Sequence, residues 1–158
     1  MHFTKALGIL LLLLCGVLGG IFLAAFERAK CRQAEGMLDL IRHIRLQIDC
    51  FGTPLSAILC SLDDKLYAAL GAPRDCTDME ALLLRTPLLL DRELCRLLRD
   101  FAASLGTGYR EEELRFCDYY LERLSPPVQR IRKELEKKTR LSLVLPPALS
   151  AALILLLC

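Results

Sequence analysis

The sequence predicts an all-α protein: an antiparallel helical bundle flanked by N- and C-terminal transmembrane helices. Three observations lead to this fold class. Hydrophobic residues make up 54% of the chain and charged residues 25%, yet the two kinds are separated along it, with uncharged stretches of bilayer length at both ends. In the charged middle, apolar residues recur at helical spacing. No stretch there alternates polar and apolar residues as a half-buried strand would.

The first uncharged stretch, Ala6 to Phe26, has 21 residues. As a helix it would be about 31 Å long, close to the thickness of a bilayer core. Residues 1–26 are therefore predicted to form the first transmembrane helix. A cleaved signal peptide is a competing interpretation, but the apolar core is too long and no small-x-small site precedes Glu27. Lipidation at Cys15 is another, although a leucine stands where a small residue is needed.

The second uncharged stretch, residues 141–158, would form a helix of about 27 Å, and we predict a second transmembrane helix there. Basic residues gather on the inner side of both stretches, whereas only Lys5 precedes the first one. By the positive-inside rule, the helical domain of residues 27–140 is predicted to lie in the cytosol of a cell membrane protein. Both termini would then lie on the far side.

The central domain carries 20 basic and 19 acidic residues, because Lys5 is the one base outside it. This balance gives no general attraction to nucleic acid. Bases are concentrated just before the second uncharged stretch, between Arg130 and Arg140. Such a cluster attracts anionic lipid headgroups, by about 1 kcal/mol for each base near the surface. Membrane lipids are therefore predicted partners, and nucleic acid is not.

The first half of the central domain predicts two helices. The apolar stripe of the first consists of Met37, Ile41, Ile44, Ile48 and Phe51. Gly52 ends it, and Thr53-Pro54 begins the second as N-cap and first-turn proline. The inner face of the second consists of Leu55, Ile58, Leu59, Leu62, Leu66 and Leu70.

Three further helices follow. Thr77 and Glu80 form a capping box that opens a short helix, and Thr86-Pro87 repeats the cap-and-proline signal for the next. Three glutamates, Glu111 to Glu113, then favour the first turn of a last helix. Its stripe consists of Leu114, Cys117, Leu121, Leu124, Val128, Ile131 and Leu135. Because that stripe keeps its register across Pro126-Pro127, we predict a bend there and not a break.

No catalytic, cofactor-binding or metal-binding site is predicted. The chain has no P-loop, dinucleotide-binding glycine motif or zinc-protease motif. His43, with Asp39 and Gln47 one turn away, could carry a proton, but its place beside the apolar stripe favours a solvated side chain. The central cysteines lie ten or more residues apart, which favours reduced, buried thiols over a disulfide framework.

Small residues recur every fourth position in the first uncharged stretch, at Gly16, Gly20 and Ala24. Such a stripe lets membrane helices approach closely. Ala148 and Ala152 supply a weaker match in the second stretch. The hypothesis is that the two spans pack on each other or on a neighbouring subunit, as in a homo-oligomer.

The layout resembles stage III sporulation protein AB of endospore-forming bacteria. The resemblance covers nearly the whole chain and depends on the basic segment from Glu27 to Arg32, the Gly52-Thr53-Pro54-Leu55 step, the Leu105-Gly106 turn and a span at each end. Two departures are Pro146-Pro147, in a second span that lacks the expected glycines, and Pro126-Pro127 in the last helix.

The resemblance implies a fold and a role. It implies a cytosolic domain similar to the helical domain of the platform protein of type II secretion and type IV pilus systems. It also implies a non-enzymatic subunit of a channel complex between mother cell and forespore. That subunit would sit in the outer forespore membrane, with a secretion-type ATPase and the other channel subunits as partners. A general membrane-anchored adaptor of vegetative cells is the alternative, and an enzyme that uses His43 with Asp39 is a third hypothesis.

Overall fold

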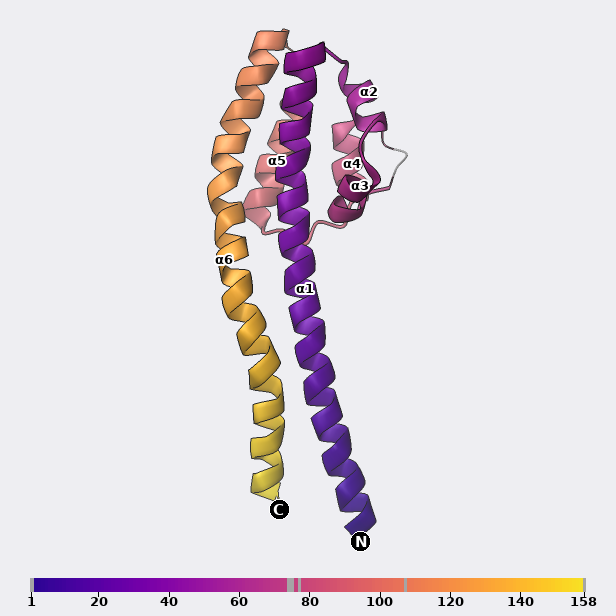
Figure 1. The fold of residues 1–158 in the computed structure, drawn as a ribbon, viewed down its shortest axis with the longest axis vertical. Helices are drawn as coiled ribbons and strands as arrows, with labels where there is room; N and C mark the ends of the chain where they lie inside the picture. The colour runs from indigo at the N-terminus through magenta and orange to yellow at the C-terminus, as the bar shows by residue number, and fades with distance from the viewer. Residues whose placement is uncertain (1, 74–75, 77, 107, 158) are drawn as a thin grey trace. The chain divides into compact units, whose positions relative to one another are not determined.

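The computed structural model describes the backbone of residues 2–73, 76, 78–106 and 108–157, without the side chains of 2–7, 9–10, 12–13, 139–147 and 149–157. Every regular element in the described part is a helix, which confirms the all-α class. In chain order the helices are α1 (His2–Phe51), α2 (Leu55–Cys60), α3 (Asp64–Leu70), α4 (Met79–Arg85), α5 (Arg92–Ser104) and α6 (Arg110–Leu157) (Figure 1).

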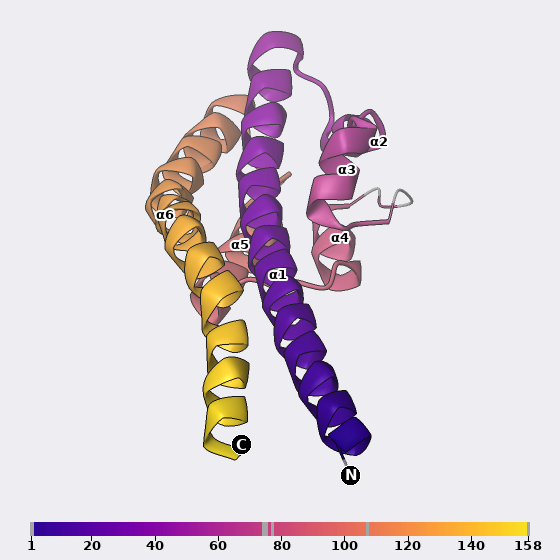
Figure 2. The ribbon, with the colours of Figure 1, turned by 60° about the horizontal axis from the view of Figure 1, so that its bottom comes forward.

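The chain divides into two compact units. The first, which we call the terminal unit, consists of residues 1–29 and 132–158, and the second, the central unit, consists of residues 30–131. Within the terminal unit, the start of α1 and the end of α6 run in opposite directions (Figures 1 and 2). Among the described residues we find no helix with the length and apolar character that a bilayer crossing requires. The predicted span at 141–158 falls almost wholly on side chains outside the described part.

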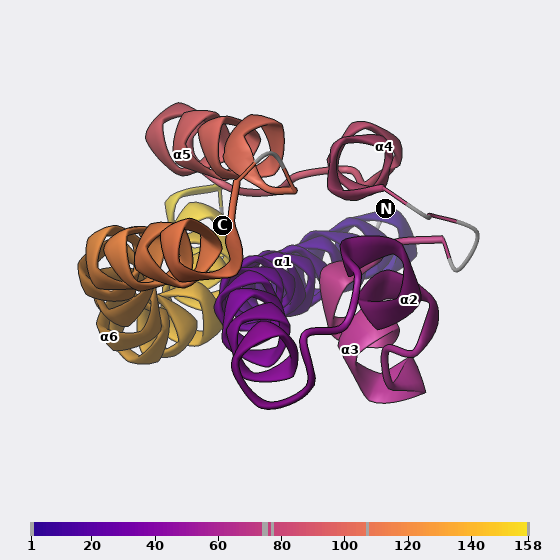
Figure 3. The same ribbon diagram turned by 90° about the horizontal axis from the view of Figure 1, so that it is seen from above.

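In the central unit, α1 lies in the middle. Figure 3 shows α6 on one side of it, α2 and α3 on the other, and α4 and α5 along a third side. The approach to α3 is close: a Cβ built on Gly36 would lie 3.2 Å from the Cβ of Ala69. On the opposite side, Arg45 donates hydrogen bonds to both carboxylate oxygens of Asp118 in α6, the longer one 3.2 Å.

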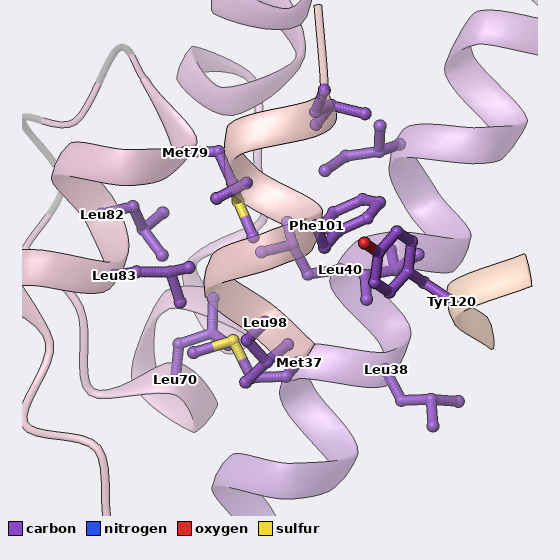
Figure 4. Close-up of a cluster of buried hydrophobic side chains, with 14 of the residues drawn as sticks. Met37, Leu38, Leu40, Leu70, Met79, Leu82, Leu83, Leu98, Phe101 and Tyr120 are labelled. Atoms are coloured by element: carbon purple, nitrogen blue, oxygen red, sulfur yellow. The ribbon is translucent and has the colours of Figure 1, made fainter. Parts of the chain in front are cut away.

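The apolar core of the central unit draws on every helix, and Figure 4 shows part of it. Leu40, Ile41 and Ile44 of α1 are fully buried. Side chains from the other helices pack around them, among them Leu59, Leu70, Leu82, Leu98, Phe101 and Leu124. Because α1 is covered on several sides, its buried face is wider than the predicted stripe and includes Leu38 and Leu40. The prediction that Phe51 is the last member of this stripe is wrong, because 72% of its side chain is exposed.

The predicted second helix is two helices. α1 ends at Phe51, before Gly52, as predicted, and Gly52 has φ +59°. However, α2 stops at Cys60 and α3 begins at Asp64. The N-cap of α2 is Pro54, not Thr53. The break is stabilised because the Tyr67 hydroxyl donates a 2.6 Å hydrogen bond to the carbonyl of Leu59, at the end of α2.

Thr86-Pro87 was predicted to begin a helix, and this is wrong. Thr86 is the C-cap of α4, and its hydroxyl donates a 2.6 Å hydrogen bond back to the carbonyl of Leu82. A threonine hydroxyl can bond the backbone at either end of a helix, so a Thr-Pro pair does not by itself mark the start of one. α5 begins at Arg92, with Asp91 as its N-cap. The predicted cap Thr77 lies outside the described residues.

The last helix agrees best with its sequence pattern. α6 begins at Arg110, has Glu111, Glu112 and Glu113 in its first turn, and continues through Pro126-Pro127 without a break. Three stripe residues, Cys117, Leu124 and Val128, are buried. The predicted continuity is therefore confirmed.

Candidate functional site

The described residues do not assemble the proton-carrying group that His43 could have formed. The Asp39 carboxylate pairs instead with Arg42, at 3.1 Å. The Nε2 atom of His43 is buried and has no hydrogen-bond partner in the described part of the chain. No group of three or more His, Cys, Asp and Glu side chains that could hold a metal ion occurs among the described residues.

A small void lies between α1, α5 and α6 in the central unit. Its volume is about 10 Å³, which is roughly the space of one water molecule. Its lining is apolar and consists of Ala34, Met37, Leu38, Leu90, Leu94, Leu98, Leu124 and Val128. This void is far too small for a substrate or cofactor, which usually occupies several hundred cubic ångströms.

Among the described buried polar side chains of the central unit, Gln33 makes the most hydrogen bonds, and it is 4% exposed. Its Nε2 donates hydrogen bonds to the carbonyls of Leu70, at 2.9 Å, and Pro87, at 3.0 Å. Its Oε1 accepts a 2.7 Å hydrogen bond from the Leu89 amide. One side chain thus joins α1 to the end of α3 and to the connection between α4 and α5. Sequence reasoning missed Gln33, although it stands four residues before Met37 on the same helix face.

In the terminal unit, Gly20 and Ala24 are buried and Gly16 is half-buried. Large apolar side chains surround this small-residue stripe, and those that the structure describes from residue 11 to residue 26 are exposed: Leu11, Leu14, Val17, Leu18, Ile21, Phe22, Leu23 and Phe26. Ala148 is exposed, and the side chain of Ala152 lies outside the described part. The start of α1 therefore presents apolar surface around most of its circumference.

A charge cluster marks the inner edge of the terminal unit. Lys138 of α6 lies 3.4 Å from the Glu27 carboxylate of α1 and 3.4 Å from Glu134. Partial burial lowers the pKa of Lys138, but the two carboxylates outweigh it, so that the pKa is raised and the ammonium keeps its charge. Lys133 and Lys137 are exposed, as a headgroup-binding cluster requires, whereas the Arg140 side chain lies outside the described part.

The described cysteines are free thiols, as predicted. Their burial is mixed: Cys31, Cys76 and Cys117 are buried, while Cys15, Cys50 and Cys60 are exposed. Burial raises the pKa of the Cys117 thiol to about 11. That thiol is therefore protonated and unreactive at neutral pH.

A row of aromatic rings leads from the core to the surface of α6. The Phe101 ring meets the Tyr120 ring edge to face, with centroids 5.3 Å apart, and Tyr120 meets Tyr119 in the same way at 5.2 Å. The Arg123 guanidinium lies 5.1 Å from the centroid of Tyr119. Sequence reasoning missed this row because only the apolar stripe was followed along α6. The pair Tyr119-Tyr120 beside that stripe was the available signal.

Comparisons with protein-family models, with curated proteins and with solved structures find no match.

Proposed function

We propose that this chain is a membrane-anchored adaptor without catalytic activity, whose helical central unit is held at the cytosolic face by its two ends. In the specific form that the resemblance implies, it is a subunit of a channel complex between mother cell and forespore. There it would provide a platform for a secretion-type ATPase. The antiparallel bundle with flanking spans at 1–26 and 141–158 is part of this proposal.

The observation that carries the proposal is the apolar surface at the start of α1. Phe22 is 74% exposed, Leu23 51% and Val17 46%, and they point in different directions around the helix. Exposing that much apolar surface to water costs about 25 cal/mol for each Å². A lipid environment removes this cost, and the sequence continues the uncharged stretch in both directions to Ala6 and Phe26.

The charges at the edge of the terminal unit support the same arrangement. Lys138 and Glu27 neutralise each other where the uncharged segments end, while Lys133 and Lys137 remain free to meet anionic headgroups.

The topology is tested with single-cysteine variants and a membrane-impermeant maleimide. Cys158 ends the second predicted span, whereas Cys60 is an exposed thiol of the central unit. When the chain is produced in vegetative cells, whose outer face the reagent reaches, we expect intact cells to label Cys158 and not Cys60, and opened cells to label both. Labelling of Cys60 in intact cells, or recovery of the chain without detergent in the soluble fraction, would refute membrane anchoring with a cytosolic domain.

The specific role is tested by purification from sporulating cells in gentle detergent, which should recover a secretion-type ATPase with the chain. Expression timing separates this role from the alternative, a general membrane-anchored adaptor. A vegetative adaptor is produced before cells commit to sporulation, whereas a channel subunit is produced after.

A further inference from the structure

The connection between α4 and α5 is fastened to the first turns of α1 that belong to the central unit. The Lys30 ammonium lies 2.8 Å from the Asp91 carboxylate. Gln33 donates a hydrogen bond to the Pro87 carbonyl, at 3.0 Å, and accepts one from the Leu89 amide, at 2.7 Å. The connection is thus held against α1 along its length, and Figure 2 shows it passing beside that helix.

This attachment keeps the connection near the end of the first uncharged stretch. Lys30 is the fourth residue after Phe26, the last residue of that stretch. Four residues of helix rise about 6 Å, and even four residues of fully extended chain reach only about 14 Å. If Phe26 lies at the edge of the hydrocarbon, residues attached to Lys30 lie near the headgroups, which form a layer roughly 5–8 Å deep on each side of a bilayer.

The connection and the helix ends beside it present apolar side chains to the surroundings. Leu84, in the last turn of α4, is 75% exposed. Pro87 is exposed, and Leu88 and Leu89 are half-buried. We call this segment, residues 84–92, the α4–α5 edge. Apolar side chains at headgroup depth are stabilised when they enter the boundary between headgroups and acyl chains.

The charges around these leucines favour an anionic surface. Arg85 precedes the leucines of the connection, Arg92 follows them, and both are exposed. Residues 28–33 and 84–93 together carry five bases, Arg28, Lys30, Arg32, Arg85 and Arg92, and two acids, Asp91 and Glu93. Asp91 is already paired with a base of α1. The acids at the start of α4, Asp78 and Glu80, lie at the other end of that helix.

We propose that the α4–α5 edge is a membrane-contact site of the central unit, which binds the headgroup layer of an anionic bilayer. Leu88 and Leu89 would meet the boundary with the acyl chains, and Arg85 and Arg92 would pair with lipid phosphates. This inference rests on the proposed membrane anchoring. It adds a third attachment to the two ends of the chain, and this attachment would hold one face of the central unit against the membrane.

The test uses the absence of tryptophan from the chain, because a single introduced indole then reports its own surroundings. The full chain with Pro87→Trp is reconstituted into vesicles of phosphatidylcholine and phosphatidylglycerol. Bromine near the carboxyl end of the acyl chains quenches indoles at that depth, and we expect it to lower the fluorescence by about twofold. Leu84→Trp is a second reporter, for the case in which Pro87→Trp does not fold by circular dichroism.

The matched control is Phe51→Trp, which also places an indole on an exposed apolar position. The Phe51 side chain is 72% exposed and stands at the end of α1. It lies about 37 Å farther along the helix than Phe26, so bromine should leave its fluorescence unaltered.

A charge-reversal pair tests the headgroup chemistry. Arg85→Glu with Arg92→Glu, in the chain that carries the reporter, should reduce the bromine effect by about threefold or more, because two attractive charges become repulsive. Vesicles of phosphatidylcholine alone should act in the same direction. Arg96→Glu with Arg99→Glu makes the same change on exposed positions of α5 and should leave the effect as it was.

A folded, vesicle-bound chain without quenching at positions 87 and 84 would overturn the membrane-contact site, and so would equal quenching at position 51. An unaltered bromine effect in the Arg85 and Arg92 variant would overturn the binding of anionic headgroups. In each of these cases the anchoring still stands, because the chain floats with the vesicles in a density gradient. A chain that fails to float would instead refute the proposed function.

Discussion

The side-chain amide of Gln33 donates a 2.9 Å hydrogen bond to the backbone carbonyl of Leu70, the last residue of α3. A carbonyl at a helix end has no partner within the helix, so a buried one needs a donor from elsewhere. Gln33 supplies it and also bonds Pro87 and Leu89 in the next connection. A single buried amide thereby fixes the position of α3 against α1.

Replacing Gln33 should destabilise the central unit. In Gln33→Glu a carboxylate would face the carbonyls of Leu70 and Pro87 with no proton to donate, and we expect a loss of about 2–4 kcal/mol in the free energy of unfolding. Denaturant unfolding of the full chain in detergent, followed by circular dichroism, measures it. Gln129→Glu changes the same residue type at an exposed site of α6 and is the control, with an expected change within about 0.5 kcal/mol. Equal effects of the two substitutions would show that the Gln33 bonds carry no net stability.

His43 is predicted to be replaceable. Its Nε2 is buried without a partner, so the folded protein bears an uncompensated desolvation cost there. We expect His43→Leu to leave the free energy of unfolding unchanged or to raise it by up to about 1 kcal/mol.

The same variant tests the enzyme hypothesis. If His43 and Asp39 carried protons in a reaction, His43→Leu and Asp39→Asn would both abolish function. We expect neither to alter sporulation or growth, scored against the parent strain. A common loss of function in two variants that remain folded would contradict this prediction and restore the enzyme.

Helical periodicity predicted the helices well and their ends less well. The apolar stripe of α6 predicts burial correctly at Cys117, Leu124 and Val128, because one face of that helix meets the core. α1 is covered on several sides, so its stripe underestimated burial at Leu38 and Leu40. The break between α2 and α3 depends on the Tyr67 hydroxyl reaching the Leu59 carbonyl, a tertiary contact that no local pattern encodes.

The surfaces were predictable to a smaller extent. Uncharged stretches and flanking bases are composition signals, and the prediction of a membrane span at each end of the chain depends on them alone. The row of rings from Phe101 to Tyr119 could not be found in this way, because it depends on which face of α6 packs against α5. The Gln33 bonds likewise join residues 37, 54 and 56 positions apart.

The stability of the central unit should depend on alkaline pH through Cys117. Its folded pKa of about 11 lies above the ordinary 9.0 of a thiol, because burial disfavours the thiolate. The folded state therefore binds more protons than the unfolded state between these values. The stability contributed by this thiol is complete below about pH 9 and is lost as the pH rises towards about 11.

Unfolding free energies of the parent and Cys117→Ala between about pH 8 and pH 11 test this, since other titrating groups cancel in the comparison. We expect the parent to be more stable by about 1 kcal/mol at the lower pH. That difference should shrink as the pH rises. In the folded chain Cys50 and Cys60, which are exposed, should react with maleimide while Cys117 does not. A difference that stays constant with pH would mean that the Cys117 thiol titrates normally.

The small-residue stripe can be tested with two adjacent glycines of α1. Gly20 is buried in the terminal unit, whereas a Cβ on Gly19 would meet nothing within 4 Å. A leucine at position 20 has to displace whatever covers it, at a cost of about 1–3 kcal/mol. A leucine at position 19 enters open space and gains up to about 1 kcal/mol of helix propensity over glycine. We therefore expect Gly20→Leu to lower the thermal midpoint in detergent and Gly19→Leu to leave it equal or higher.

Native mass spectrometry of both variants shows whether the stripe packs within one chain or between copies, because only the second arrangement changes the oligomeric state. Identical midpoints and identical assembly for the two variants would mean that neither a helix of this chain nor one of a second copy packs on the stripe.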